Sequence, residues 1–229
     1  KAFRGHVIEQ LETQVPQLQM RVLCGATGSA KTRVLHALAE RGEQVLDLEG
    51  YANHKGSLLG GLPGIEQPSQ KRFETLLAEQ LETFDLSRPV YLEGESAKIG
   101  RVGLPLVLVQ HLHKAPVIEV RATTAARLSY LLRDYAYLGD DPEALATKLG
   151  WLKELQGNET VGRWQQWARA KDLSPLFEEL MLRHYDPHYE RSQSNHFKQW
   201  PQRQVLETDD LSDEAIARLA EQVMALEAR

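Results

Sequence analysis

Short apolar runs alternate with amphipathic segments along the first 122 residues. The runs at 18–24, 44–50, 89–96 and 115–122 predict buried strands, and the segments at 31–42, 70–84 and 103–113 repeat their apolar residues with a helical period. Strands that alternate with helices predict right-handed crossovers and a parallel sheet covered on both faces. The expected fold is therefore α/β, with three layers.

The pattern changes after residue 122. Residues 123–200 read as helices only, and one strand (202–210) and one helix (211–229) follow. We therefore expect a lead-in or linker at 1–16, an α/β domain formed by 17–122 and 201–229, and an α-helical insertion at 123–200. The glycine-rich segment 53–70 is expected to be a long loop, which in a compact domain is usually functional or mobile.

The turn after the first expected strand reads "GATGSAKT" (25–32) and has the outline of a phosphate-binding loop. In such a loop successive backbone N–H groups and the following helix N-terminus surround an anion. Lys31 would add a charge, and Thr32 would offer its hydroxyl to phosphate or Mg²⁺. The phosphate-binding candidates are Gly25, Thr27, Gly28, Ser29, Ala30, Lys31 and Thr32. The fold expected from this motif is that of the P-loop NTPases.

Alanine stands at position 30, where this motif has its second glycine. If the backbone there needs a positive φ, the Cβ costs about 1–2 kcal/mol, which weakens the loop without abolishing it. Natural tolerance and an engineered substitution both remain open.

Phosphate-loop NTPases usually hold Mg²⁺ with an aspartate at the end of a strand, and this sequence has no clean match to it. Glu93 and Glu95 stand at the expected place, and Asp47 and Glu49 follow another strand. Such carboxylates bind Mg²⁺ or act as bases, and solvated acids are as common there.

Composition places the chain among folded globular proteins, with 42% hydrophobic and 26% charged residues in 229. The net charge of −5 equals that of residues 205–229, which carry seven acids against Arg218 and Arg229. Residues 98–133 hold six lysines and arginines against Glu119, so a local basic surface is expected.

The longest apolar run, 104–109, is much shorter than the roughly 20 residues that cross a bilayer, and no secretory h-region is visible. We therefore expect no membrane segment and a cytoplasmic location. Cys24 is the single cysteine, which excludes an intrachain disulfide, and we interpret it as an inert core thiol. Because the chain begins with Lys1 rather than Met, it is expected to be part of a longer protein.

The expected insertion is rich in aromatic residues. Residues 130–200 contain 11 of the 16 aromatic side chains, interleaved with arginines, a combination that stacks on RNA bases and follows phosphates. We expect about two thirds of them to form the core of the insertion instead. His184 and His188 have helical spacing, but Pro187 is expected to break the helix between them.

Four segments together resemble one family. The segments "GATGSAKT", "VLDLEGYANHKGS", "QPSQKRFE" and "VYLEGESAKIG" resemble the phosphate-loop domain of bacterial tRNA 2-selenouridine synthases, from Met20 to at least Tyr137. That family joins an N-terminal rhodanese-like domain with a catalytic cysteine to this domain and a helical region. The present sequence corresponds to the phosphate-loop part, and it shows no counterpart of the rhodanese-like domain or of that cysteine.

The resemblance implies a tRNA-modifying transferase. The family geranylates 2-thiouridine at the wobble position of certain tRNAs with geranyl diphosphate, and then replaces the geranylthio group with selenium from selenophosphate. The anion in the phosphate loop would thus be a diphosphate that departs, and Thr32 would be the candidate Mg²⁺ ligand. The implied partners are tRNA with 2-thiouridine and the rhodanese-like domain; the oligomeric state stays open.

The resemblance and the basic segment also nominate residues beyond the loop. The candidate catalytic residues are Glu49, His54, Lys55, Glu93 and Glu95. The candidates for binding substrate or RNA are Asn53, Gly56, Ser57, Gln67, Ser69, Gln70, Ser96, Arg101, Arg127 and Arg133.

Two other functions remain open. A small-molecule or nucleoside kinase also has a phosphate loop, and Arg121, Arg127 and Arg133 would then belong to its lid. A non-catalytic tRNA-binding module would bind tRNA tightly without geranyl transfer. ATP turnover with a small acceptor would favour the kinase.

Overall fold

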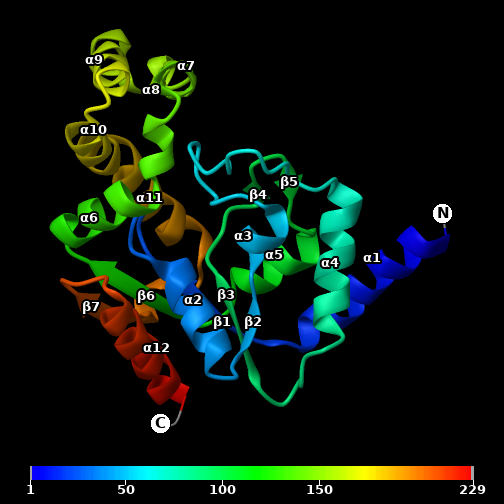
Figure 1. Cartoon of the computed structure of the whole chain (residues 1–229). Helices are drawn as coiled ribbons and strands as arrows, with labels where there is room; N and C mark the ends of the chain where they lie inside the picture. Colours follow the sequence, from blue (N-terminus) through cyan, green and yellow to red (C-terminus); the bar gives the residue numbers. More distant parts are fainter. Residues whose placement is uncertain (1, 228–229) are drawn as a thin grey trace.

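The computed structural model describes residues 2–227, and its centre is a five-stranded sheet in the order β2-β3-β1-β6-β7 (Figure 1). The strands are β1 (Gln19–Cys24), β2 (Gln44–Leu46), β3 (Pro89–Glu93), β6 (Val117–Ala122) and β7 (Gln204–Thr208). All neighbouring strands are parallel. The expected α/β fold with a parallel sheet is confirmed, and the chain returns to the sheet after residue 200.

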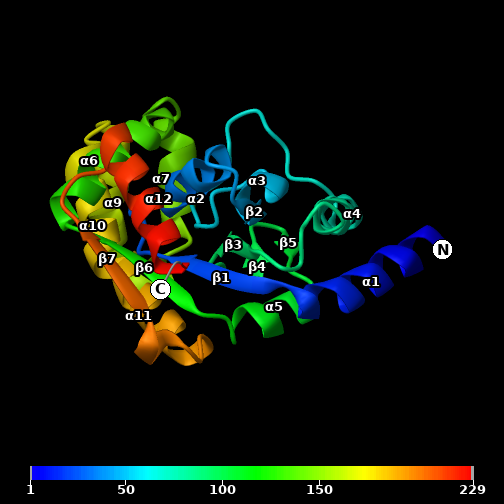
Figure 2. The ribbon, with the colours of Figure 1, turned by 90° about the horizontal axis from the view of Figure 1, so that it is seen from below.

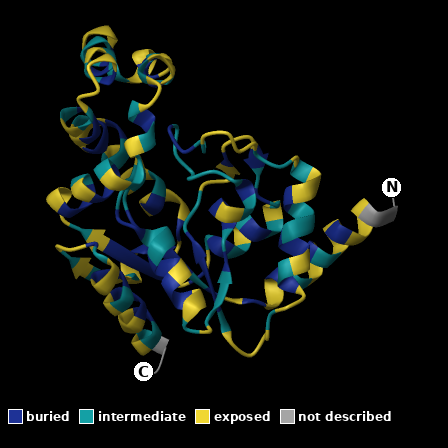
Figure 3. Cartoon of the chain, in the orientation of Figure 1, coloured by how far each residue is buried: buried dark blue, intermediate teal, exposed yellow. Residues whose placement is uncertain are grey.

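Helices cover both faces of the sheet, as the pattern predicts. Val22 and Leu92 face a core shared with α1 (Ala2–Gln14), α4 (Gln70–Leu81) and α5 (Leu106–Leu112). The residues adjacent to these in the strands, Leu23 and Tyr91, face a core shared with α2 (Lys31–Glu40) and α12 (Asp213–Glu227). Figure 2 shows the sheet between these layers, and Figure 3 shows its three central strands, β1, β3 and β6, as largely buried. The three-layer, P-loop NTPase-like fold is confirmed.

Three segments differ from the sequence prediction. The second strand ends at Leu46, because Asp47 accepts a hydrogen bond from the Gly50 amide at 2.7 Å and starts α3 (Leu48–Ala52). The lead-in forms α1, which packs against α4 and buries Leu11, so it belongs to the domain core. A hairpin of β4 (Lys98–Ile99) and β5 (Val102–Gly103) is too short to show a periodic pattern.

Residues 123–200 are helical, as predicted, and have a core of their own. They form α6 (Thr124–Asp134), α7 (Pro142–Gly150), α8 (Lys153–Gln156), α9 (Asn158–Arg169), α10 (Leu173–Leu180) and α11 (Asp186–His196), with short 3₁₀ turns at Ala136–Gly139 and Trp200–Gln202. The buried side chains of Leu149, Trp164 and Phe177 form this core, and Leu59 from the long loop packs into it. The loop is thereby tied to the insertion.

Pro187 does not break the helix, so that prediction was wrong. A π-helical turn, Met181–Tyr185, runs directly into α11, where Pro187 occupies the first turn. The helix continues through the proline because the wider π-helical turn before it relieves the clash of the ring with the preceding turn. The rings of His184 and His188 therefore remain neighbours, with centroids 4.8 Å apart.

Candidate functional site

The loop between β1 and α2 has the backbone of an anion-binding nest. Gly28 and Ala30 have φ values of +84° and +59°, which turn successive amides toward one side. The positive φ at Ala30 means that its methyl group strains the backbone by about 1–2 kcal/mol. The Ser29 side chain is buried, and its hydroxyl has no hydrogen-bond partner among the described residues. A phosphate oxygen would supply one.

A cavity of about 580 Å³ opens over this loop. The phosphate loop forms one wall, the segments 55–57 and 94–96 form a second, and helices α6 and α11 form a third. All seven phosphate-binding candidates line it, together with Glu49, Lys55, Gly56, Ser57, Glu95 and Ser96. The carboxyl ends of parallel strands meet at this edge of the sheet, which is where ligands bind in open α/β folds.

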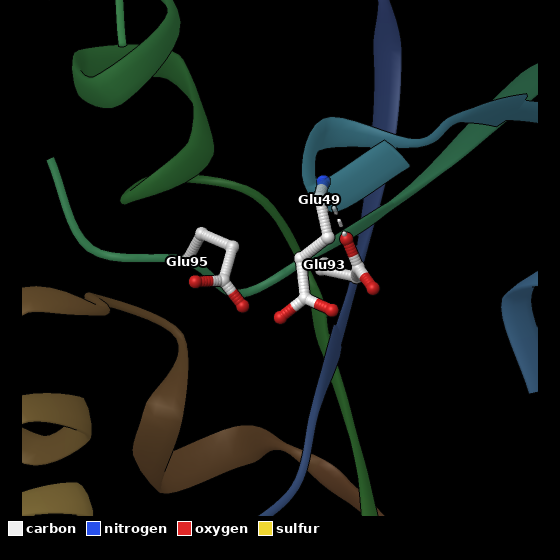
Figure 4. A group of neighbouring side chains, drawn as sticks. All are labelled: Glu49, Glu93 and Glu95. Carbon is white, nitrogen blue, oxygen red and sulfur yellow. Dashed lines mark hydrogen bonds between the residues drawn. The ribbon is translucent and has the colours of Figure 1, made fainter. Parts of the chain in front are cut away.

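Three carboxylates gather beside the nest (Figure 4). Oxygens of Glu49, Glu93 and Glu95 lie within 4.8 Å of one another. Glu93 ends β3, the strand next to β1, and its carboxylate accepts a hydrogen bond from the Thr32 hydroxyl over 2.5 Å. The same hydroxyl lies 3.0 Å from Glu49. Glu93 thus occupies the place of the expected strand-end aspartate.

Lys31 is the cation of this cluster. Its Nζ lies 3.8 Å from Glu49 and 3.5 Å from Glu95. Burial disfavours the charge of Lys31, but the three carboxylates outweigh it and raise the pKa of its amine. Burial also raises the pKa of Glu49 to about 7, opposed by Lys31 and reinforced by Glu95. Burial and the Glu49 charge raise the pKa of Glu93 well above its ordinary value. One lysine therefore does not neutralise the cluster.

The oxygen donors of this cluster fit Mg²⁺. A hydroxyl and carboxylates are the ligands that this cation prefers, and a cation would offset the like charges that raise the pKa of Glu93. Thr32 and Glu93, already in contact, are the residues that would hold it.

The loop that carries Lys55 closes over the carboxylates. Gly56 has a φ of +70°, and a Cβ there would lie 2.7 Å from oxygens of both Glu49 and Glu95. Lys55 is turned toward the insertion, where its Nζ pairs with Asp134 at 2.6 Å and lies 4.3 Å from the ring centre of Tyr135. These contacts give Lys55 an anchoring role, in addition to its place in the cavity wall.

Sequence reasoning missed the wall formed by α6 and α11. Its side chains are Tyr130, Asp134, Tyr135, Tyr185, His188, Tyr189, Ser192 and Gln193. Those from Tyr185 to Gln193 are spaced so that they lie on one face of a helix. This polar and aromatic stripe is the signal from which the wall could have been predicted. Tyr189 has a solvent-inaccessible hydroxyl without a partner among the described residues.

His188 lines this cavity and has one ring nitrogen without a partner among the described residues. Its Nδ1 lies 2.7 Å from the carbonyl oxygen of His184. A carbonyl only accepts hydrogen bonds, so Nδ1 carries the proton. In the neutral ring the lone pair is then on Nε2, and no described residue bonds to it.

Arg127 is buried, which corrects the expectation that it contacts RNA. Its side chain is 7% exposed and pairs with Asp186 over 2.6 Å, while its Nε donates to the Thr27 carbonyl over 2.9 Å. The residue therefore fastens α11 to the phosphate loop.

Several other candidates hold the loops together and do not line the cavity. Gln67 donates to the carbonyls of Ala52 and Ile99, and Arg101 donates to Gln67. Gln70 bonds both backbone groups of Gly103.

Three further candidates lie at helix ends or in the long loop. Ser69 caps α4, and Asn53 caps α3 and donates to Glu66. His54 forms a β-bridge with Gly61. The side chains of Gln67, Gln70, Arg101, Ser69 and Asn53 thus have backbone partners, so we assign them to loop shape, whereas the buried Nδ1 of His54 has no partner among the described residues. Arg133 lies outside the cavity, where it donates to the Leu211 carbonyl.

Cys24 ends β1 beside Gln193, with 3.4 Å between sulfur and amide oxygen. Burial raises the pKa of its thiol, so it remains protonated. This agrees with an inert core thiol.

A small apolar pocket adjoins the cavity. Its volume is about 20 Å³, and Thr27, Ser57, Tyr135 and Tyr185 line both spaces. The remaining lining is apolar: Leu59, Leu131, Leu138, Phe177, Leu180 and Met181. The phosphate loop therefore lies between a polar cavity and an apolar recess of the insertion.

A family model described as the tRNA 2-selenouridine synthase AAA domain matches residues 18–148. The chain belongs to the tRNA 2-selenouridine synthase family. The match includes the phosphate loop, the three carboxylates and α6, and it ends within α7. None of the helices in the described range 2–227 is long and apolar enough to cross a bilayer.

Curated relatives agree with the family match. The chain is 39% identical over 137 residues to the tRNA 2-selenouridine synthase of Alcanivorax borkumensis, which covers 59% of this chain and 36% of that protein. The synthase of Marinobacter nauticus is 38% identical over 160 residues, a match that covers 66% of this chain and 41% of that protein. The synthase of Shewanella frigidimarina is 41% identical over 138 residues, a match that covers 59% of this chain and 36% of that protein. The chain thus matches less than half of each of these relatives.

Among solved structures, an unliganded sugar kinase from Janibacter sp. covers 91% of this chain and 95% of its own, at 13% identity and a TM-score of 0.31. A TM-score of this size does not show a shared fold.

Proposed function

We propose that this chain is the part of a tRNA 2-selenouridine synthase that transfers a geranyl group from geranyl diphosphate to the sulfur of 2-thiouridine in tRNA. The observation that carries the proposal is the position of the phosphate loop between a polar cavity and an apolar recess. A prenyl diphosphate has the same division, with an anionic end and a hydrocarbon chain. The family membership supplies the tRNA substrate.

The proposed reaction forms one bond and breaks another. The thiouridine sulfur attacks C1 of the geranyl group, the C1–O bond breaks, and its electron pair leaves with the diphosphate. The nest amides and Lys31 stabilise the charge that develops on the leaving group. The product loses the proton of the uracil N3, and we assign its acceptance to the Nε2 of His188, a residue that lines the cavity.

The carboxylates and the metal have a supporting part in this proposal. Thr32 and Glu93 would hold Mg²⁺, which supplies positive charge for the diphosphate when bound. Glu49 and Glu95 hold Lys31 at the floor of the cavity. Replacement by selenium would follow with selenophosphate and the family's rhodanese-like domain, in the cytoplasm.

The transfer is tested by incubating the chain with geranyl diphosphate and tRNA that contains 2-thiouridine, followed by mass spectrometry of the nucleosides. We expect S-geranyl-2-thiouridine with the unaltered chain, and a rate lower by about 100-fold with Lys31→Met, since one charge-assisted contact to the leaving group is lost. Lys153→Met, on the exposed surface of α8, is the matched control and should retain the full rate. Absence of the geranylated nucleoside, or equal rates for both variants, would refute the proposal.

His188→Gln separates the proton acceptor from the diphosphate site. Glutamine keeps a polar side chain but cannot accept a proton at neutral pH. We expect the transfer rate to fall by about 10² to 10⁴ while pyrophosphate affinity stays unchanged. An unchanged rate would remove His188 from the reaction and leave the diphosphate site intact.

A further inference from the structure

Two segments without acidic residues meet on one side of the sheet. Residues 97–118 and 191–206 contain no Asp or Glu, although the whole chain carries 32. The first segment includes α5 and the second includes the end of α11, and Leu112 and Phe197 from these segments pack in the same core. Figure 2 shows α5 and α11 on the same side of the sheet. The Lys198 amide donates to the His113 carbonyl over 2.9 Å, so the two segments are in contact.

The outward side of α11 leads away from the reaction cavity. His188, in the first turn of the helix, lines that cavity. Arg191 and Asn195 follow it by three and seven residues, so all three lie on one face of the helix, and all three are exposed. Lys198 lies two residues beyond the helix end, and Lys114 follows its contact partner on α5. We call the surface formed by these five residues the α11 stripe.

The cations of the α11 stripe have no ion-pair partners. Arg191, Lys198 and Lys114 are exposed, and no carboxylate of the described residues pairs with them. Glu190 lies about 200° around the helix from the start of the stripe, on a side where its charge acts on Arg121. A chain with a net charge of −5 therefore keeps a line of unpaired positive charges that begins at the reaction cavity.

This stripe has the character of a surface that follows a phosphate backbone. Such surfaces are rich in lysine and arginine, whereas the centre of a protein interface is apolar. None of the large exposed hydrophobic side chains of the described chain lies on the stripe, and Leu106 is at the other end of α5 from Lys114. From His188 to His196 the helix rises about 12 Å, which spans about three or four nucleotides of a stacked strand.

We propose that the α11 stripe binds the phosphate backbone of the RNA strand that continues from the target nucleotide in the cavity. The proposal rests on the proposed geranyl transfer, because that reaction brings the target nucleotide to His188. Arg191, Lys198 and Lys114 each contact a phosphate, and the Asn195 amide donates to a phosphate or sugar oxygen. The stripe thus positions the tRNA without reading its bases.

The proposal is tested with a stem-loop RNA that carries 2-thiouridine in its loop, whose binding to the chain is measured by fluorescence anisotropy at several salt concentrations. We expect the double variant Arg191→Gln/Lys198→Gln to bind this RNA about 25-fold more weakly at about 0.1 M salt, because two phosphate contacts are lost. For the same reason the slope of log affinity against log salt concentration should be shallower by about 1.4. The affinity for pyrophosphate should not change.

The matched control is the double variant Lys71→Gln/Lys153→Gln, which removes the same charge from exposed positions on α4 and α8. It should bind the RNA as the unaltered chain does. If the Arg191→Gln/Lys198→Gln variant keeps the affinity and the salt slope of the unaltered chain, or if the control loses as much affinity, the proposal is wrong. The cations would then serve another partner, such as an acidic protein surface.

The outcomes separate the α11 stripe from the geranyl transfer. If the Arg191→Gln/Lys198→Gln variant loses RNA affinity but the unaltered chain forms no geranylated nucleoside, the stripe stands and the transfer is refuted. If that variant forms the geranylated nucleoside with the same dependence on RNA concentration as the unaltered chain, the stripe is refuted and the transfer stands. If the unaltered chain binds no RNA, the stripe is wrong, and the affinity for geranyl diphosphate still tests the diphosphate site.

Discussion

Glu93 is the residue at which stability and function conflict most clearly. Its side chain is fully buried beside Glu49 and Glu95, and its charge is stabilised by the Thr32 hydroxyl, by the Glu49 amide at 3.4 Å and by the shared Lys31. Functional sites commonly retain groups of this kind at a cost in stability. A bound cation would offset the like charges of this cluster.

Glu93→Gln should stabilise the chain in the absence of ligand. The pKa of Glu93 is raised, so the folded state holds its proton more tightly than the unfolded chain does. Stability is therefore lost as pH rises above the ordinary value of 4.5 toward the raised one. Glutamine removes this loss and still accepts the Thr32 hydrogen bond. We expect the unfolding midpoint of the variant to exceed that of the original chain, with a gap that widens from pH 5 upward.

The measurement is thermal unfolding at several pH values, where about 1 kcal/mol corresponds to 2–4 °C for a domain of this size. Glu154→Gln, at an exposed position of α8, should show no gap at any pH. The same Glu93→Gln variant should bind pyrophosphate with less benefit from added Mg²⁺. A midpoint that falls at every pH would contradict this view of the cluster.

At the scale of elements, the attachment of α11 to the phosphate loop decides the shape of the site. One arginine provides it: Arg127 on α6 bonds Asp186 at the start of α11 and the Thr27 carbonyl in the nest. The π-helical turn Met181–Tyr185 precedes this contact and sets which side chains of α11 face the cavity.

Arg127→Leu should cost about 3 kcal/mol of unfolding free energy, because it leaves the partly buried Asp186 and the Thr27 carbonyl without their partner. Adding Asp186→Asn should recover part of the loss, since the unpaired charge is removed. Arg169→Leu breaks the exposed pair with Glu143 and should cost less than about 1 kcal/mol. Urea unfolding of the four proteins measures this. Equal losses for Arg127→Leu and Arg169→Leu would show that the contact is not structural.

Much of the fold follows from local patterns. The four strands and the three helices predicted before the insertion are encoded by the spacing of apolar residues, and the phosphate loop by consecutive residues of one turn. Residues 47–50 were misassigned because Asp47 caps a helix that is only five residues long, too short for a period to show. Gln67 and Gln70 donate to backbone carbonyls of the loops that lie opposite them. The sequence pattern does not show which loop lies opposite, so it could not separate these residues from residues that bind a ligand.

At the scale of the whole molecule, the site is an assembly of three distant segments. The nest comes from residues 25–32, the carboxylates from 49–95, and the facing wall from 130–193. Residues 130–193 are far from the phosphate loop in the sequence and meet it only in the folded chain. Their polar stripe was therefore not recognised as part of the site. The insertion therefore closes the cavity in which the proposed reaction occurs.

The central claim is that the nest holds a diphosphate while a hydrocarbon chain enters the apolar recess. Titration calorimetry of the chain with geranyl diphosphate and with inorganic pyrophosphate measures this directly. We predict that geranyl diphosphate binds about tenfold or more tightly, since burying two methylene groups is enough for that difference, and that Lys31→Met weakens both ligands. Equal affinities for the two ligands, or geranyl diphosphate binding that is indifferent to Lys31→Met, would contradict the account.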